Sequence, residues 1–166
     1  LTSAFIAQEN HWGFHEGAIV SHLDELKNHL SKHPHRKDWI IKRPYSFSGI
    51  GHYQFKADSF DEAILQKILI EQVLLEPMYQ RVFDIGTTFV IKNGQIQKQF
   101  MVENFNSSSG GFKGGAGSSD VDKFKKYIFE KYHYSLDELE FITKKIAQKY
   151  LDKGAVANIQ IDSFIY

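Results

Sequence analysis

The fold of this chain is decided by residues 39–51, whose sequence is WIIKRPYSFSGIG. The stretch begins with a short apolar run that is typical of a buried strand, and Lys42 closes this run. A turn rich in proline, serine and glycine follows directly, and a second strand-like run begins at Ile50. We therefore expect a strand–loop–strand unit with one cation at the mouth of a loop whose backbone N–H groups can face a polyphosphate.

The segments on either side predict a mixture of helices and hairpins. Helices are expected after Ser21, Ser59 and Ser135, because in each case an acid follows three residues later as in a capping box. The last of these helices should end at Gly154 in a left-handed C-cap. Asn93-Gly94 predicts a two-residue hairpin turn. The other expected elements are a helix over 120–131 and strands over 50–55, 73–75, 83–91, 95–102 and 155–166. Because the strands come in hairpins, the expected class is α+β with antiparallel sheets.

Composition limits the partners that the chain can have. Its 166 residues suffice for one domain or two small lobes, and 20 Lys plus Arg balance 20 Asp plus Glu. We therefore expect no nucleic-acid and no membrane partner, and any phosphate site must be local. The absence of cysteine excludes disulfides and thiolate metal sites and favours a cytoplasmic setting. Because the chain begins with Leu1 and ends within a strand-like run, we expect a fragment.

Two groups of residues are candidate ligands of a nucleotide. Lys42 beside the Ser/Gly loop suits phosphate, although a lysine at a strand end can also simply extend to solvent. Glu76 and Asp84 enclose an apolar segment containing Met78, which suits an adenosine, because carboxylates accept hydrogen bonds from amino and hydroxyl groups. The alternative is a pair of solvated strand-end acids, one of them paired with Arg81.

Three further features have both a functional and a structural interpretation. Asp162 lies in an alternating apolar strand, where it either binds Mg²⁺ or occupies the exposed face of an edge strand. The Gly/Ser-rich residues 106–119 are expected to form either a mobile functional loop or a linker. The eight histidines include His33 and His35 on either side of Pro34, but no HExxH motif is present, so we assign them surface or structural roles.

Three of these segments occur in an order that resembles the ATP-grasp enzymes. Residues 41–51 are similar to the lysine-plus-small-residue loop of that family, and residues 75–84, LEPMYQRVFD, look like its hinge segment and the acid after it. Residues 161–166, IDSFIY, are similar to the strand that bears the first metal-binding acid. The resemblance covers roughly residues 20–166.

The resemblance implies an ATP-grasp-like α+β fold of two small lobes, with antiparallel sheets flanked by helices and an ATP cleft between them. Residues 21–78 would form the N-terminal lobe with the phosphate loop. Residues 79–166 would form a truncated C-terminal lobe with a mobile loop at 106–119. Residues 1–20 have no assigned role.

The resemblance also implies a ligand for each candidate residue, with ATP and Mg²⁺ as cofactors. Lys42 would contact the α- and β-phosphates and Lys113 the γ-phosphate, so these two are the expected catalytic residues. The other implied contacts are Ser46, Ser48, Gly49 and Gly51 around the phosphates, Glu76 and the backbone near Met78 at the adenine, Asp84 at the ribose, and Asp162 at Mg²⁺.

Members of this family activate a carboxylate as an acyl-phosphate, which an amine or similar nucleophile then attacks. The resemblance therefore implies an ATP-dependent ligase acting on a small-molecule or peptide carboxylate. The sequence lacks the family's usual substrate-binding domain and its Glu- and Asn-bearing metal strand, so we expect a core that is incomplete at both ends. One alternative is a non-catalytic nucleotide-binding or protein-interaction module. A third possibility, an α+β domain without a nucleotide site, predicts that Lys42, Glu76 and Asp84 do not converge.

Overall fold

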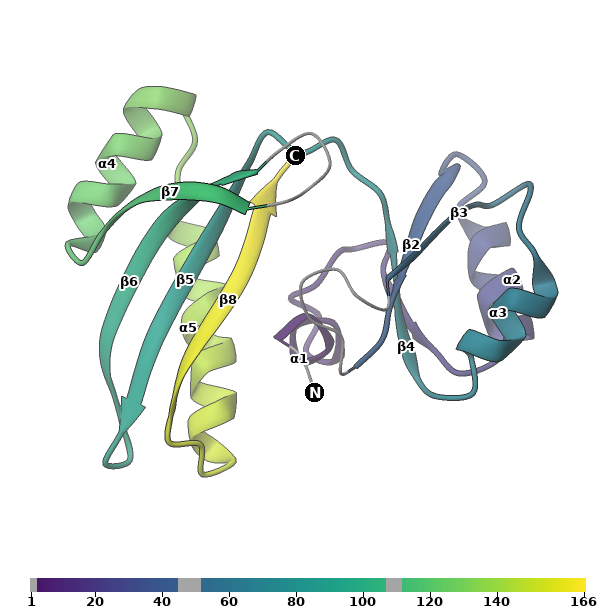
Figure 1. Ribbon diagram of the computed structural model, residues 1–166, viewed down its shortest axis with the longest axis horizontal. Coiled ribbons are helices and arrows are strands. Elements are labelled where there is room, and N and C mark those ends of the chain that lie inside the picture. Colours follow the sequence, from purple (N-terminus) through teal and green to yellow (C-terminus); the bar gives the residue numbers. More distant parts are fainter. Residues whose placement is uncertain (1–2, 45–51, 107–111) are drawn as a thin grey trace. The chain divides into compact units, whose positions relative to one another are not determined.

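The computed structural model describes residues 3–44, 52–106 and 112–166, except for the side chain of Lys98. The chain forms two compact units, Leu1–Tyr79 and Gln80–Tyr166. Each unit contains a four-stranded antiparallel sheet with helices packed against it (Figure 1). The expected α+β class with antiparallel sheets is confirmed. Within the described ranges, no helix is both long enough and apolar enough to cross a membrane.

The first unit is organised around a sheet with the strand order β1-β4-β2-β3. Trp39, Ile41 and Leu75 point to one face, where α2 and α3 contribute Leu26 and Leu65 to a shared core. In Figure 1, α1 lies on the other side of this sheet from α2 and α3. The elements of this unit are α1 (Ser3–Glu9), β1 (Ala18–Val20), α2 (Leu23–Lys32), β2 (Asp38–Lys42), β3 (Tyr53–Lys56), α3 (Glu62–Ile68) and β4 (Val73–Pro77).

The second unit has a longer sheet with the order β7-β6-β5-β8, in which every neighbouring pair is antiparallel. Ile85 and Met101 point inward to meet Phe124, Ile128 and Leu136 from the helical layer. The polar residues that alternate with them therefore lie on the opposite face, away from the helices. The elements are β5 (Phe83–Lys92), β6 (Gln95–Asn106), β7 (Phe112–Ser118), α4 (Val121–Tyr132), α5 (Asp137–Asp152) and β8 (Ala157–Ile165).

Backbone conformation confirms both glycine-based predictions. Asn93 and Gly94 have φ values of 53° and 69°, as a two-residue turn with two left-handed positions requires. Gly154 has a φ of 79° directly after the C-cap of α5. Both signals depend on only a few adjacent residues, so tertiary contacts do not override them.

The predicted helix caps are mostly wrong. His22 precedes α2 without a side-chain cap, and the Ser21 N–H instead donates to Glu25. Asp61, rather than Ser59, caps α3 by accepting the N–H groups of Ala63 and Ile64. The cap position of α5 is Leu136. The Ser135 hydroxyl accepts a hydrogen bond from the N–H of Asp137, whereas the capping box predicts the N–H of Glu138 as the donor. Ser59 and Asp61 both precede α3, and the structure uses the residue directly before the helix.

Two segments contain more regular structure than expected. The N-terminal residues form α1 and β1. Within the expected loop 106–119, β6 extends to Asn106 and Phe112–Ser118 forms the edge strand β7; residues 107–111 lie outside the described residues. A Cβ atom on Gly115 or Gly117 would lie 2.8 Å or 2.7 Å from a backbone carbonyl oxygen of β6. The glycines that suggested a flexible loop therefore allow the two strands to approach closely.

Candidate functional site

Lys42 and Glu76 form an ion pair across the first sheet. The β2–β4 register places Ile40 opposite Glu76 and Lys42 opposite Leu74, so both charged side chains point away from α2 and α3. The side chain of Glu76 is 6% exposed and that of Lys42 is 20% exposed. Lys42 therefore does not simply extend to solvent. It compensates a buried carboxylate that would be costly alone, and an ammonium with three N–H donors can also bind an anion.

The neighbours of this pair are only partly described. Ser46, Ser48, Gly49 and Gly51 lie outside the described residues, so the phosphate loop stays a prediction. The backbone N–H of Met78 donates to the Asp38 carbonyl oxygen over 2.8 Å and extends the pairing of β4 with β2. Because this N–H is already used, the predicted contact between the Met78 backbone and adenine would have to be made by the Met78 carbonyl.

Asp84 and Asp162 share one face of the second sheet. In the β5–β8 register Asp84 lies opposite Phe164, and Asp162 lies opposite Gly86. The two acids are therefore diagonal neighbours, and residues in such a pair are about 7–8 Å apart, with their Cβ atoms somewhat closer. Their face is the one that α4 and α5 leave uncovered. Gly86 contributes no side chain to it, and a Cβ atom there would lie 3.1 Å from Val102 and 3.3 Å from Asn104.

The two acids have different surroundings. Asp84 accepts hydrogen bonds from Arg81 over 3.0 Å and from the Asn106 amide over 2.8 Å, and its side chain is 19% exposed. Asp162 is exposed and accepts a hydrogen bond from Gln160 over 2.8 Å. The ion pair between Asp84 and Arg81, which the sequence offered as an alternative to a nucleotide contact, is therefore present. Both carboxylates keep acceptor capacity, because each has two oxygens.

The predicted metal and γ-phosphate ligands are exposed. Lys113 lies on the edge strand β7, next to the register shift between Phe105 and Asn106. Within the ranges that the structure describes, Asp162 belongs to no group of three side chains that could hold a metal together. Asp162 therefore supplies one carboxylate, which suits a Mg²⁺ ion that takes its other ligands from water and from a nucleotide's phosphates.

A buried acid that the sequence reading missed lies on the opposite face of the second sheet. Glu103 is 2% exposed and accepts hydrogen bonds from Tyr127 over 2.8 Å, from Lys131 over 2.9 Å, and from Tyr132. Burial raises the pKa of Glu103, but these donors outweigh burial and lower the pKa below its usual value. The sequence feature that predicts this burial is the two-residue spacing between Met101 and Glu103, which places both side chains on the inward side of β6.

A second missed cluster surrounds Glu16 in the first unit. Its carboxylate accepts a hydrogen bond from Nε2 of His35 over 2.8 Å and forms an ion pair with Arg36. It also accepts a hydrogen bond from the Tyr79 hydroxyl over 3.5 Å. Burial raises the pKa of Glu16, but the hydrogen bonds and charges of Arg36 and His35 outweigh it, and the pKa falls to about 2. No local pattern predicts this cluster, because its members are separated by up to 63 positions.

Sequence comparison finds no matching protein family and no curated relative of the chain. Structure comparison finds similar solved structures. One is a RiPP-associated ATP-grasp ligase from Chryseobacterium gregarium in complex with ADP and a leader and core peptide; it is 16% identical, with 90% of this chain and 42% of that chain covered and a TM-score of 0.49. Another is D-alanyl-alanine synthetase A from Vibrio cholerae, with 14% identity, coverages of 89% and 45%, and a TM-score of 0.49.

A third similar structure is the ATP-grasp ligase PsnB complexed with a minimal precursor, with 8% identity, coverages of 88% and 40%, and a TM-score of 0.42. The chain spans less than half the length of these solved structures. Two of the three are named ATP-grasp ligases, the family that the order of residues 41–51, 75–84 and 161–166 resembles. Each of the three similarities spans about nine-tenths of this chain.

Proposed function

We propose that this chain is the nucleotide-binding core of an ATP-grasp ligase and that it binds ATP with Mg²⁺. The observation that supports this most directly is the ion pair between Lys42 and Glu76. Two residues that the family resemblance assigns to one nucleotide lie 34 positions apart in the sequence and meet on one sheet face.

In the first unit, Lys42 binds the α- and β-phosphates and Glu76 accepts a hydrogen bond from the adenine amino group. The Lys42 ammonium has donors beyond the one that Glu76 uses, so it can hold a phosphate oxygen while the ion pair persists. The Met78 carbonyl is a second acceptor for the adenine. Ser46, Ser48, Gly49 and Gly51 supply hydroxyl and backbone N–H groups around the phosphates.

In the second unit, the uncovered sheet face receives the ribose and the metal. Asp84 accepts the ribose hydroxyl groups, and its bonds to Arg81 and Asn106 hold the carboxylate in place. Asp162 ligates Mg²⁺, which neutralises phosphate charge when it is bound. Gly86 keeps the face between these acids flat. Lys113 on β7 reaches the γ-phosphate.

The proposed reaction is the ATP-dependent ligation of a small-molecule or peptide carboxylate to an amine or similar nucleophile. A carboxylate oxygen attacks the γ-phosphorus, the bond to the β–γ bridging oxygen breaks, and ADP leaves. The amine nitrogen then attacks the acyl carbon, phosphate leaves, and the nitrogen loses a proton. Lys42 and Lys113 contribute by positioning the phosphates and by stabilising the charge on the transferred group.

The test is calorimetry of the full-length protein with Mg²⁺ and a non-hydrolysable ATP analogue. Lys42→Ala should weaken binding by about 2–3 kcal/mol, the scale for losing a charged hydrogen-bonding partner. Lys56→Ala is the matched control, because Lys56 is an exposed lysine on the same sheet face, opposite Asp38 in the register. The absence of any nucleotide binding by the intact protein would refute the proposal. Binding without ligation of any offered carboxylate would favour a non-catalytic nucleotide-binding module.

A further inference from the structure

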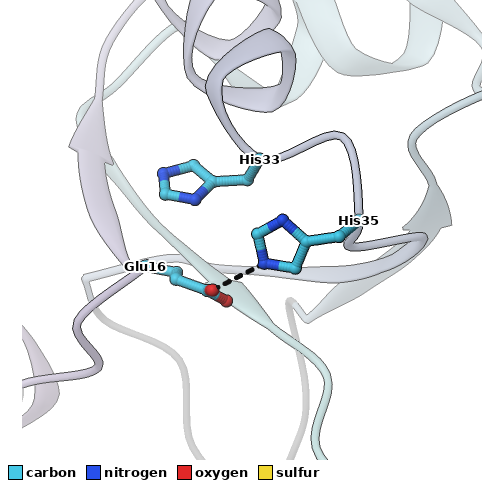
Figure 2. A group of neighbouring side chains, drawn as sticks. All are labelled: Glu16, His33 and His35. Carbon is cyan, nitrogen blue, oxygen red and sulfur yellow. Dashed lines mark hydrogen bonds and ion pairs between the residues drawn. The ribbon is translucent and has the colours of Figure 1, made fainter.

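Glu16, His33 and His35 gather at one corner of the first unit (Figure 2). The two histidines belong to the turn between α2 and β2, where Pro34 separates them, and His33 is the C-cap residue of α2. Glu16 lies in the segment before β1, 19 positions from His35. The fold therefore brings two imidazoles and one carboxylate together from separate segments.

The Glu16 carboxylate is held in a fixed orientation. The Arg36 guanidinium and the Tyr79 hydroxyl both contact Oε2. The other oxygen, Oε1, faces Nε2 of His35 at 2.8 Å. The backbone carbonyl of Glu16 in turn accepts a hydrogen bond from Nε2 of His29 over 2.8 Å. One carboxylate oxygen is thus anchored by outer partners while the other is presented to the histidines, as in metal sites whose ligands are oriented by a second layer of hydrogen bonds.

His33 completes the group with two uncommitted ring nitrogens. Its ring is half-buried and contacts the rings of His29 at 4.7 Å, His35 at 6.1 Å and Trp39 at 6.2 Å between centroids. Among the described residues, neither ring nitrogen of His33 forms a hydrogen bond. A half-buried imidazole without a polar partner, next to a carboxylate and a second imidazole, has the donor capacity that a metal ion uses.

The donor atoms are close enough to share one ion. One ligand atom from each of the three side chains lies within 4.8 Å of the other two. In a tetrahedral zinc site with bonds of about 2.0–2.1 Å, ligand atoms are about 3.3 Å apart. The Glu16–His35 pair is already near that spacing, and a ring nitrogen of His33 lies within 4.8 Å of both other donors. We propose that Glu16, His33 and His35 form a zinc(II) site with water as the fourth ligand.

The donor set selects the class of metal. Imidazole suits Zn²⁺ and related transition ions, whereas Mg²⁺ prefers oxygen ligands alone. This site is therefore chemically distinct from Asp162. The ion replaces the hydrogen bond between His35 and Glu16, and Arg36 keeps its contact with the other carboxylate oxygen. The ion joins the segment before β1 to the α2–β2 turn, so it stabilises the first unit and takes no part in phosphate chemistry.

The test is a zinc titration of the full-length protein after removal of bound metal, read by a competing chromogenic chelator and by the melting temperature. The wild-type protein should bind one equivalent with a raised melting temperature, and Mg²⁺ should give no such rise. His33→Gln and His35→Gln should each weaken binding at least tenfold. The His35 side chain is 59% exposed, so its replacement tests the site without disturbing the core. Circular dichroism confirms that each variant is folded.

His22→Gln is the matched control, because His22 is an exposed histidine at the opposite end of the same helix. It should leave both the zinc affinity and the melting temperature unchanged. Equal zinc affinity of the wild-type protein and the two site variants overturns the proposal. An equal loss in His22→Gln overturns it as well, since binding then follows the number of histidines. Nucleotide binding is measured separately, and its outcome does not affect this test.

Discussion

Glu76 is buried beside Lys42, and the ion pair that joins them crosses from β4 to β2. The partner of a buried carboxylate cannot be removed without leaving an uncompensated charge. The same lysine is the proposed phosphate ligand, so the proposal gives one side chain both a structural and a binding role. Removing it should change the stability of the first unit as well as its affinity for a nucleotide, and the two effects must be separated.

Lys42→Met should destabilise the nucleotide-free protein by about 3 kcal/mol, because Glu76 is left buried without its counter-ion. Adding Glu76→Leu should recover part of the loss, since the unpaired charge is removed with its partner. Urea unfolding of the two single variants and the double variant measures the coupling free energy between Lys42 and Glu76. We expect a coupling of about 1–3 kcal/mol. Lys56→Met should change stability by about 0.5 kcal/mol or less. Additive effects of the two substitutions would show that the pair has no energetic role.

Asp162→Asn should weaken binding of the nucleotide with Mg²⁺ about tenfold but leave metal-free nucleotide binding unchanged, because it removes one charged oxygen ligand. Stability should change by about 0.5 kcal/mol or less, since the side chain is exposed. Titration calorimetry with and without Mg²⁺ measures both affinities. Asp152→Asn is the control, because Asp152 is also exposed and also accepts a glutamine amide over 2.8 Å. An equal loss without Mg²⁺ would assign Asp162 another role.

Glu103 should make the second unit sensitive to acid. Its pKa is lowered in the folded state, so the folded protein binds this proton less readily than the unfolded chain does. The contribution of the Glu103 carboxylate to folding stability is therefore complete above its unfolded pKa of about 4.5. It is lost as the pH falls through the pKa that Glu103 has in the folded protein. Glu103→Gln should cost about 2–3 kcal/mol at pH 7, and the difference from wild type should shrink at pH 3.

Urea unfolding at several pH values measures this difference. The charged and titratable groups that face Glu103 are Tyr127, Lys131 and Tyr132, and all three remain in the variant. Glu130→Gln on α4 is the control, since its side chain is 65% exposed and its contact with Lys126 is 3.8 Å long. A difference between wild type and Glu103→Gln that stays constant from pH 7 to pH 3 would contradict the lowered pKa.

Gly117→Ala should loosen β7 from β6, because the added Cβ atom would lie 2.7 Å from the Met101 carbonyl oxygen. We expect a loss of about 1–3 kcal/mol and faster hydrogen exchange of the amides of residues 101–106. Gly94→Ala is an informative comparison. Its Cβ atom would have nothing within 4 Å, but the φ of 69° costs about 1 kcal/mol for a side chain. Unchanged exchange in Gly117→Ala would indicate that β7 does not pair as described.

The successes and failures of sequence reading follow from how far each signal extends along the chain. The turn at Asn93-Gly94 and the end of α5 at Gly154 were predicted, because each depends on adjacent residues. The caps of α2, α3 and α5 were misassigned, because each helix begins one or two residues later than the capping serine predicts. The strand β7 was missed, because glycine is read as flexibility until a partner strand requires close approach.

The sequence by itself determined the α+β class, the hairpin of β5 and β6, and the alternation that turns Glu103 inward and Asp162 outward. These properties follow from backbone preferences and from side-chain periodicity over a few residues. The tertiary structure decided which distant residues meet. The order β1-β4-β2-β3 places Glu76 beside Lys42, and the packing of the segment before β1 against the α2–β2 turn places Glu16 beside His33 and His35. Such pairings depend on the burial of a whole sheet, which no local pattern encodes.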